Sequence, residues 1–142
     1  MKSERLTSDV SRFAEPGLPH RYPFQLVDRV VAIEPGRWAI GVKQISRSEL
    51  FIDDGDRLPR VLLMEAMAQV AGIAAASAPH AAQAATLARL DRFRCRPVFA
   101  GERLLVTARV VRRFGANVLA RASVRVDGRP RAAAELVLHF VA

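Results

Sequence analysis

Residues 61–76 read VLLMEAMAQVAGIAAA, and this stretch decides the fold of the chain. Its apolar side chains fall on nearly every face of the helix that it predicts, which is typical of a helix surrounded by protein. Pro59 stands just before it, where a missing amide proton costs little, and Pro79 soon ends it. A helix that is apolar all round must be covered, so the rest of the chain has to supply the cover.

Strand-like segments lie on both sides of the predicted helix. Two precede it, around the turn signal Glu34-Pro35-Gly36-Arg37, and four follow it, the last three of them joined by the turns Gly115-Ala116-Asn117 and Asp127-Gly128-Arg129-Pro130. Two strands, one long apolar helix and four strands indicate an α+β fold, in which a twisted antiparallel sheet curls around the helix. The expected strands are residues 24–33, 38–45, 87–95, 103–114, 117–126 and 131–141.

Length and composition indicate one domain. The chain has 142 residues, 51% of them hydrophobic, which suits a single core; we expect residues 1–17 to form an arm or short helix and residues 18–142 to form the domain. No apolar run is long enough to span a bilayer and no signal region follows the polar N-terminus, so a cytoplasmic protein is expected. Cys95 is the only cysteine, and the three histidines are scattered, so neither a metal site nor a cofactor is expected.

The chain is strongly basic, with 22 Lys and Arg against 14 Asp and Glu, a formal net charge of +8. Such a surface attracts acidic partners, among them nucleic acid and acidic carrier proteins. Nucleic acid is disfavoured because aromatic residues are few and no stacking or zinc-finger motif accompanies the arginines. Arg89, Arg92, Arg94 and Arg96 are predicted to share one strand face, where they can dock a carrier or simply face solvent.

Two longer motifs carry a family resemblance. LPHRYPFQLVDRV (residues 18–30) and LLMEAMAQVAGI (residues 62–73) resemble the opening signature and the central helix of the FabZ/FabA-type 3-hydroxyacyl carrier-protein dehydratases. LDRFRCRPVFAGERL (residues 90–104) and VRVDGRPRAAAEL (residues 124–136) are similar to the remaining strands of that family. The resemblance implies a hot-dog fold, an acyl thioester of carrier protein or coenzyme A as ligand, and a homodimer or heterodimer with acyl tunnels at the subunit interface.

Glu65 is the first candidate catalytic residue. The resemblance implies that a histidine removes the α-proton while a carboxylic acid on the central helix protonates the departing 3-hydroxyl. Glu65 falls on that helix position, and as a lone acid among Leu, Met, Ala and Val it is placed where burial favours a bound proton. Gln69, one turn later, is expected to hold the carboxyl in place. The alternative is that Glu65 fills a polar spot at a dimer seam.

The start of the helix adds two candidate substrate-binding residues. The first-turn amides near Arg60 and Val61 have no acceptor within the helix, and a thioester carbonyl is a suitable one. The resemblance implies that such an amide polarises the carbonyl and makes the α-proton acidic. The family's Pro-Gly-Val-Leu has become Pro59-Arg60-Val61-Leu62 here, which places a long cation at the mouth of the tunnel.

The chain departs from the family where the catalytic histidine belongs. Residues 50–59 read LFIDDGDRLP, without histidine, and Asp56 follows Gly55 where the family has that histidine; His20, His80 and His139 lie elsewhere. Three hypotheses stay open. The chain gives Glu65 to a histidine-bearing partner in a heterodimer; or Glu65 or Asp56 drives thioester hydrolysis, as carboxylates do in hot-dog thioesterases; or the chain binds acyl groups or carrier protein without catalysis.

Overall fold

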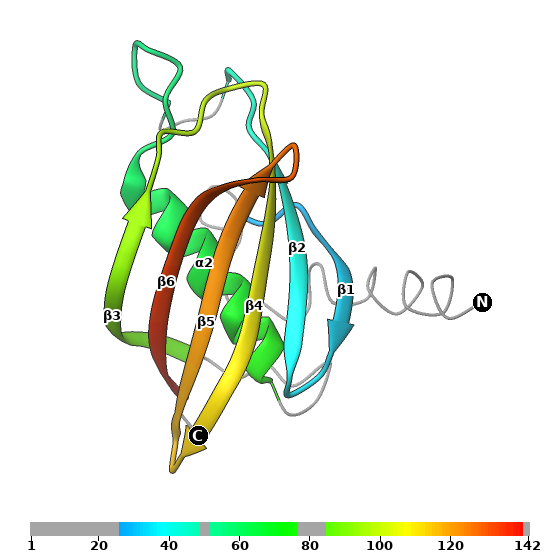
Figure 1. Ribbon diagram of the computed structural model, residues 1–142, viewed down its shortest axis with the longest axis vertical. Coiled ribbons are helices and arrows are strands. Elements are labelled where there is room, and N and C mark those ends of the chain that lie inside the picture. Colours follow the sequence, from blue (N-terminus) through cyan, green and yellow to red (C-terminus); the bar gives the residue numbers. More distant parts are fainter. Residues whose placement is uncertain (1–25, 49–51, 77–84, 141–142) are drawn as a thin grey trace, which may run out of the picture.

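The computed structural model describes residues 26–48, 52–76 and 85–140. Within these ranges a six-stranded sheet packs against one long helix (Figure 1), in the strand order β1-β2-β4-β5-β6-β3, and every neighbouring pair is antiparallel. The predicted α+β architecture, a sheet curled around a helix, is confirmed. The elements are β1 (Arg29–Glu34), β2 (Trp38–Gln44), α2 (Arg60–Ala75), β3 (Ala85–Cys95), β4 (Arg103–Phe114), β5 (Asn117–Val126) and β6 (Arg129–Phe140).

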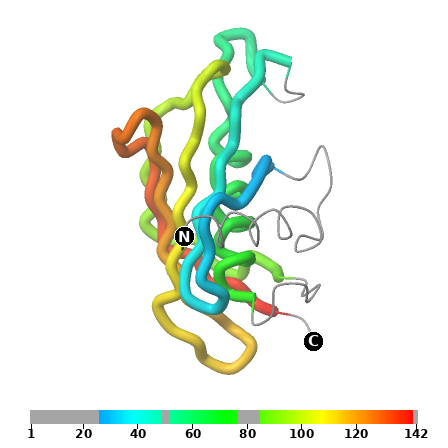
Figure 2. Tube along the Cα trace, turned by 90° about the vertical axis from the view of Figure 1, so that its right-hand side faces the viewer, coloured from blue at the N-terminus to red at the C-terminus, as the bar shows by residue number. Residues whose placement is uncertain are grey.

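The core lies between α2 and one face of the sheet, and Figure 2 shows the helix along that face only. α2 packs mainly against β4, β2 and β5 and less against β6 and β3. Strand side chains alternate between this core and the opposite face, so β5 has the burial pattern expected of a half-buried strand. The fully buried side chains include Leu63, Met67 and Val70 of the helix and Leu104, Val106, Val124, Leu136 and Leu138 of the sheet.

Gly41 sets the distance between β2 and the helix. A Cβ atom built on it would lie 2.8 Å from Cγ1 of Val27 and 3.0 Å from Cγ2 of Val70. Both neighbours are short branched side chains with little freedom to move aside. A glycine at this position therefore lets α2 pack close to the sheet.

The first strand is shorter than predicted. Residues 26–28 of the expected strand 24–33 are described and are not strand, whereas residues 24 and 25 lie outside the described part, as do the predicted arm 1–17 and the start of the domain at Leu18. The segment is held by the helix and by single contacts to β2: the Leu26 amide donates to Oε1 of Gln69 (2.9 Å), the Asp28 amide donates to the Val42 carbonyl (2.9 Å), and Oδ2 of Asp28 accepts the Gln44 amide (2.6 Å). The start of the sheet is thus fastened to the helix.

The turn before β6 is also shorter than predicted. Asp127 and Gly128 have positive φ angles of 51° and 75°, and β6 already begins at Arg129. Positive φ at both central residues is the conformation that two-residue hairpins favour, and an Asp-Gly pair adopts it readily. Arg129 and Pro130 therefore belong to the strand instead of the turn.

An arginine of β4 binds the C-terminal end of the helix. Arg113 of β4 donates from Nη2 to the carbonyl oxygen of Ala75 (2.6 Å) and to that of Gly36 (3.4 Å). A cation at a helix C-terminus satisfies carbonyls that have no partner within the helix and interacts favourably with the helix dipole. One side chain thus joins β4, the β1–β2 turn and the end of α2.

Candidate functional site on the central helix

Glu65 stands in the second turn of α2, on the face that the sheet does not cover. It shares this face with Val61 four residues before it and with Ala68 and Gly72 three and seven residues after it. Val61 is 61% exposed, and Glu65, Ala68 and Gly72 are half-buried. The other faces of α2 are buried in the core, and this face presents one carboxyl group beside small or apolar neighbours.

The first turn of α2 begins after Pro59, which makes no side-chain cap. The Leu62 and Leu63 amides both donate to the Pro59 carbonyl, at 3.0 and 3.4 Å. Neither the Arg60 nor the Val61 amide has an acceptor within the described ranges 26–48, 52–76 and 85–140. The two predicted substrate-binding residues thus lie one turn before Glu65, with their amides available to an external acceptor.

Gln69 is buried, with 4% of its surface exposed. Its Oε1 atom accepts the Leu26 amide, so the side chain anchors the segment that precedes β1. The sequence pattern did not indicate this contact, because the two residues lie 43 positions apart. Its expected role beside the Glu65 carboxyl stays a prediction.

Asp56 lies in a tight turn just before α2. Oδ1 of Asp53 accepts the Gly55 and Arg57 amides, each at 2.9 Å, and the Asp56 carbonyl oxygen accepts the Ala100 amide at 2.7 Å. Asp56 itself has a positive φ of 59°. The turn is thus held by its own hydrogen bonds and is fastened to the segment before β4.

The Asp56 side chain is 44% exposed, and its Oδ2 atom lies 3.4 Å from the guanidinium of Arg47. Sequence reasoning singled out Asp56 but missed Asp53 and Arg47. The Asp-x-Gly spacing of residues 53–55 is a usable signal for the turn, because an aspartate often accepts a backbone amide two residues on. The ion pair to Arg47 has no such local signal.

The one described histidine lies away from Glu65. His139 of β6 is on the sheet face opposite α2, where its Nδ1 atom is 3.0 Å from Oδ1 of Asn117. Its neighbour Leu138 is buried on the core side, as alternation along a strand requires. His20 and His80 lie outside the described residues. The described part of the chain therefore brings no imidazole to the helix carboxyl.

The described residues contain no candidate metal site, because no three His, Cys, Asp or Glu side chains among them lie close enough together to hold an ion. Among the same residues, no helix is long and apolar enough to cross a membrane.

An antiparallel sheet curled around a helix that carries a single acid defines a hot-dog-fold protein. Solved structures agree on the fold. The dehydratase heterocomplex ApeI:P from Xenorhabdus doucetiae matches with a TM-score of 0.78 at 17% identity, over 91% of each chain. A hypothetical thioesterase from Streptococcus pneumoniae, solved with coenzyme A, matches with a TM-score of 0.66 at 9% identity, over 79% of this chain and 84% of that one.

Sequence comparison gives the family. The model of the ApeP-like family, described as ApeP dehydratase, matches residues 13–91. The 3-hydroxyacyl-[acyl-carrier-protein] dehydratase FabZ of Pelotomaculum thermopropionicum is 37% identical over 84% of this chain and 90% of its own length. The FabZ of Listeria welshimeri is also 37% identical, over 78% and 81%. The chain therefore belongs to the family of FabZ-like and ApeP-like dehydratases; the sequence motifs predicted its FabZ-type membership but not the match to the ApeP-like model.

Proposed function

We propose that this chain binds the acyl thioester of a carrier protein or of coenzyme A in the cytoplasm, and lends Glu65 to an active site whose histidine comes from a partner subunit. The observation that carries the proposal is the placement of Glu65. Its carboxyl lies on the face of the core helix that the sheet does not cover, and no histidine of the described residues accompanies it there.

The relatives support this proposal in two ways. FabZ proteins are named as dehydratases of 3-hydroxyacyl carrier-protein substrates, so a matching chain is a candidate for the same ligand. A structural neighbour is described as a dehydratase heterocomplex, so two different hot-dog chains can assemble. A chain that keeps the helix acid but has no histidine in residues 50–59 fits the role of one such subunit.

The chemistry divides between the two chains. The partner's histidine takes the α-proton of the substrate, the double bond forms, and the 3-hydroxyl leaves as water after the Glu65 carboxylic acid has protonated it. The amides of Arg60 and Val61 donate hydrogen bonds to the thioester carbonyl, which stabilises the negative charge that develops on its oxygen. Gln69 is proposed to support the position of Glu65, one turn before it.

The open edge of the sheet offers a place for the partner. β3 ends the sheet, and no other strand of the described residues pairs with its second edge. An unpaired edge strand presents backbone donors and acceptors to another chain. Leu87, Leu90 and Phe93, on the core side of β3, are only partly buried, so a partner strand would also cover apolar surface.

The test is an assay of the purified chain, alone and mixed with a histidine-bearing hot-dog protein encoded beside it, on a 3-hydroxyacyl carrier-protein substrate. We expect dehydration only in the mixture. Glu65→Gln should lower its rate about 100-fold or more, because the proton donor is lost. Asp54→Asn, which removes an exposed carboxylate from the nearby turn, is the matched control and should leave the rate within about twofold of the unsubstituted mixture.

Three results would contradict the proposal. Hydrolysis of an acyl thioester by the chain alone, lost in Asp56→Asn or Glu65→Gln, would identify a thioesterase. Saturable binding of the acylated carrier without turnover, alone or mixed, would identify a non-catalytic binder. Dehydration by the chain alone would show that no histidine from a partner is needed.

A further inference from the structure

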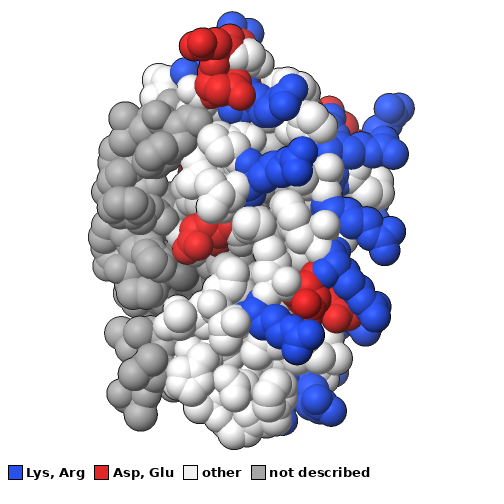
Figure 3. Space-filling model, turned by 90° about the vertical axis from the view of Figure 1, so that its left-hand side faces the viewer, with Lys and Arg blue, Asp and Glu red and all other residues white. Residues whose placement is uncertain are grey.

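The sheet face opposite α2 is rich in arginine. Figure 3 shows Lys and Arg side chains gathered along one side of the molecule, and they come from this outer face. One row crosses the sheet through directly paired residues, Asp91 of β3, Glu135 of β6, Arg121 of β5 and Arg109 of β4. The two acids are adjacent in this row, and so are the two arginines. Like charges directly opposite each other destabilise a strand pair, so this arrangement calls for a reason beyond folding.

A hollow of about 610 Å³ lies along this row. Hydroxyl groups stand on its floor, since Thr107 of β4 and Ser123 of β5 are directly paired there, beside Ala133 of β6. Such a volume is within the range of small-molecule sites. The lining consists of Arg92, Arg94, Thr107, Arg109, Arg121, Ala122, Ser123, Ala133, Ala134 and Glu135.

Two of the arginine side chains around the hollow have no partner among the described residues. The guanidinium groups of Arg94 and Arg109 make no ion pair or hydrogen bond within those ranges, and both residues are exposed. Arg121 and Arg92 share one acid, because Oε1 of Glu135 lies 3.2 Å from Nε of Arg121 and 4.0 Å from Nη1 of Arg92. The hollow therefore has a positive excess that a bound anion would neutralise.

Arg92 is held toward the hollow by an unusual backbone. It has a positive φ of 52°, which non-glycine residues rarely adopt, and it lies where the β3–β6 register shifts between Asp91 and Arg94. A β-bulge of this kind redirects a side chain and is common beside functional sites. The bulge also puts Arg94 on the outer face, paired with Ala133, although it lies five residues after Arg89 of the same face.

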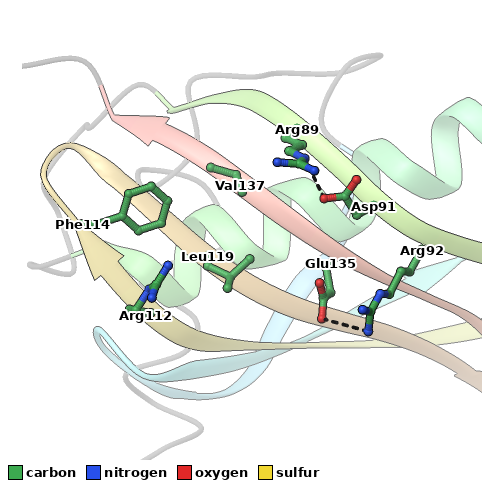
Figure 4. Close-up of a pocket in the computed structure, with 8 residues that line it drawn as sticks. All are labelled: Arg89, Asp91, Arg92, Arg112, Phe114, Leu119, Glu135 and Val137. Atoms are coloured by element: carbon green, nitrogen blue, oxygen red, sulfur yellow. Dashed lines mark ion pairs between the residues drawn. The ribbon is translucent and has the colours of Figure 1, made fainter.

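A second hollow, of about 520 Å³, adjoins the first and shares Arg92 and Glu135 with it. Figure 4 shows its apolar wall, formed by Phe114, Leu119 and Val137 from three neighbouring strands. Phe114 is 41% exposed, and the Arg112 guanidinium lies 5.3 Å from the centre of its ring, so a planar group would contact the part of the ring that Arg112 leaves open. A cationic hollow with hydroxyl groups thus continues into one with an aromatic wall.

From these features we infer that the outer face binds a nucleoside di- or triphosphate, at a site separate from the Glu65 face of α2. Arg94, Arg109 and the hydroxyl groups of Ser123 and Thr107 bind the phosphates, because guanidinium groups match phosphate oxygens in charge and geometry. The base lies against Phe114. An acidic protein is disfavoured as occupant because the charges surround a depression of small-molecule size.

Calorimetric titration of the full chain with ADP at about 50 mM NaCl tests the site. We expect saturable binding that weakens about tenfold or more in the double variant Arg94→Gln/Arg109→Gln. Arg103→Gln/Arg129→Gln is the matched control, since it removes two exposed arginines that line neither hollow, and it should change affinity by less than about threefold.

Two single variants make the test specific. Glu135→Gln should strengthen ADP binding, because it frees Arg121 and Arg92 from their shared acid. Phe114→Ala should weaken binding of ADP and leave that of inorganic tripolyphosphate unchanged. Absence of saturable ADP binding would overturn the inference. Equal losses of ADP affinity in the two double variants would also overturn it. So would an oligonucleotide that binds more tightly than ADP and loses the same affinity in both double variants. Either result means general attraction to a basic surface.

Discussion

At the residue scale, the pair of Glu102 and Arg131 holds together the segment between β3 and β4. The two side chains meet as a double fork, with Nη1 to Oε1 at 3.0 Å and Nη2 to Oε2 at 2.8 Å. Oε1 of Glu102 also accepts the Phe99 amide at 2.8 Å, and Nη1 of Arg131 donates to the Pro97 carbonyl. One partly buried ion pair thus fixes the chain reversal before β4 to the start of β6.

The pair makes stability depend on pH. Partial burial alone would raise the pKa of Glu102, but the hydrogen bonds from Arg131 and the Phe99 amide and the charge of Arg131 outweigh it and hold the pKa below its usual 4.5. A depressed pKa means that the pair stabilises the fold above about pH 4.5 and that this contribution is lost as the pH falls through the lower, folded value. Glu102→Gln should therefore cost about 1 kcal/mol at pH 7 and progressively less toward pH 3.

Urea unfolding between pH 3 and 7 measures this difference. Glu34→Gln is the control, because that side chain is about half exposed in its pair with Arg37, and its effect should stay within about 0.5 kcal/mol. A Glu102→Gln effect of constant size across the whole pH range would contradict the assignment.

Single residues were predictable from the sequence where they broke a local pattern. Glu65 stands out as the one acid of an apolar helix, and the resemblance to the family singles out Asp56; the roles of both residues stay predictions. The unpaired state of Arg94 and Arg109 had no local signal, because it depends on which residues of neighbouring strands stand opposite them. Cross-strand partners follow from register, and a single bulge changes the register of every later residue.

At the scale of elements, two glycines on opposite sides of the helix contact are expected to respond differently to an added methyl group. Gly41 in β2 has branched side chains within 3.0 Å of the position of a Cβ, whereas Gly72, on the face of α2 that the sheet does not cover, has no atom of the described residues within 4 Å of it. Gly41→Ala should destabilise the protein by about 1–3 kcal/mol, because it overpacks a close contact. Gly72→Ala should stabilise it by up to about 1 kcal/mol, because alanine favours the helix.

Thermal or urea unfolding measures the change in stability of both variants. Each variant serves as the control of the other because both add one methyl group. Equal effects of the two substitutions would show that space at β2 does not limit the approach of the helix.

The elements themselves were largely predictable because their patterns are strong and local. The helix differs from its predicted bounds by one residue at each end, and the strands after it were found in their order. The predicted strand bounds are wrong where tertiary contacts override propensity. This is the case at residues 26–28, which bind Gln69 and β2. The contact of Arg113 with the helix end could not be predicted either, because it depends on the bulge between Val110 and Arg112, which turns the side chain toward the helix.

At the scale of the whole molecule, charge is unevenly distributed. The chain carries a net charge of +8, and many of its arginines stand on the outer sheet face, where Arg109 of β4 and Arg121 of β5 are directly paired. Their repulsion is exposed to solvent and therefore responds to ionic strength. Raising NaCl from about 10 to 150 mM should increase the unfolding temperature.

Differential scanning calorimetry with NaCl measures this increase, and phosphate and sulfate are avoided because they would bind the same arginines. Arg109→Gln should reduce the increase, since it removes one member of the like-charged pair Arg109–Arg121. Arg129→Gln, at an exposed position outside the row, serves as the control. An unfolding temperature that falls with salt would show that favourable ion pairs dominate instead.

The strand order has a consequence for synthesis of the chain. β3 forms the edge of the sheet and pairs only with β6 among the described strands, and β6 is synthesised after the other strands that the structure describes. Until then β3 has no partner among the described strands, and its apolar side chains stay open to other molecules. A chain that stops before Arg129 would therefore lack β6 and would also leave β3 without the strand that it pairs with in the sheet.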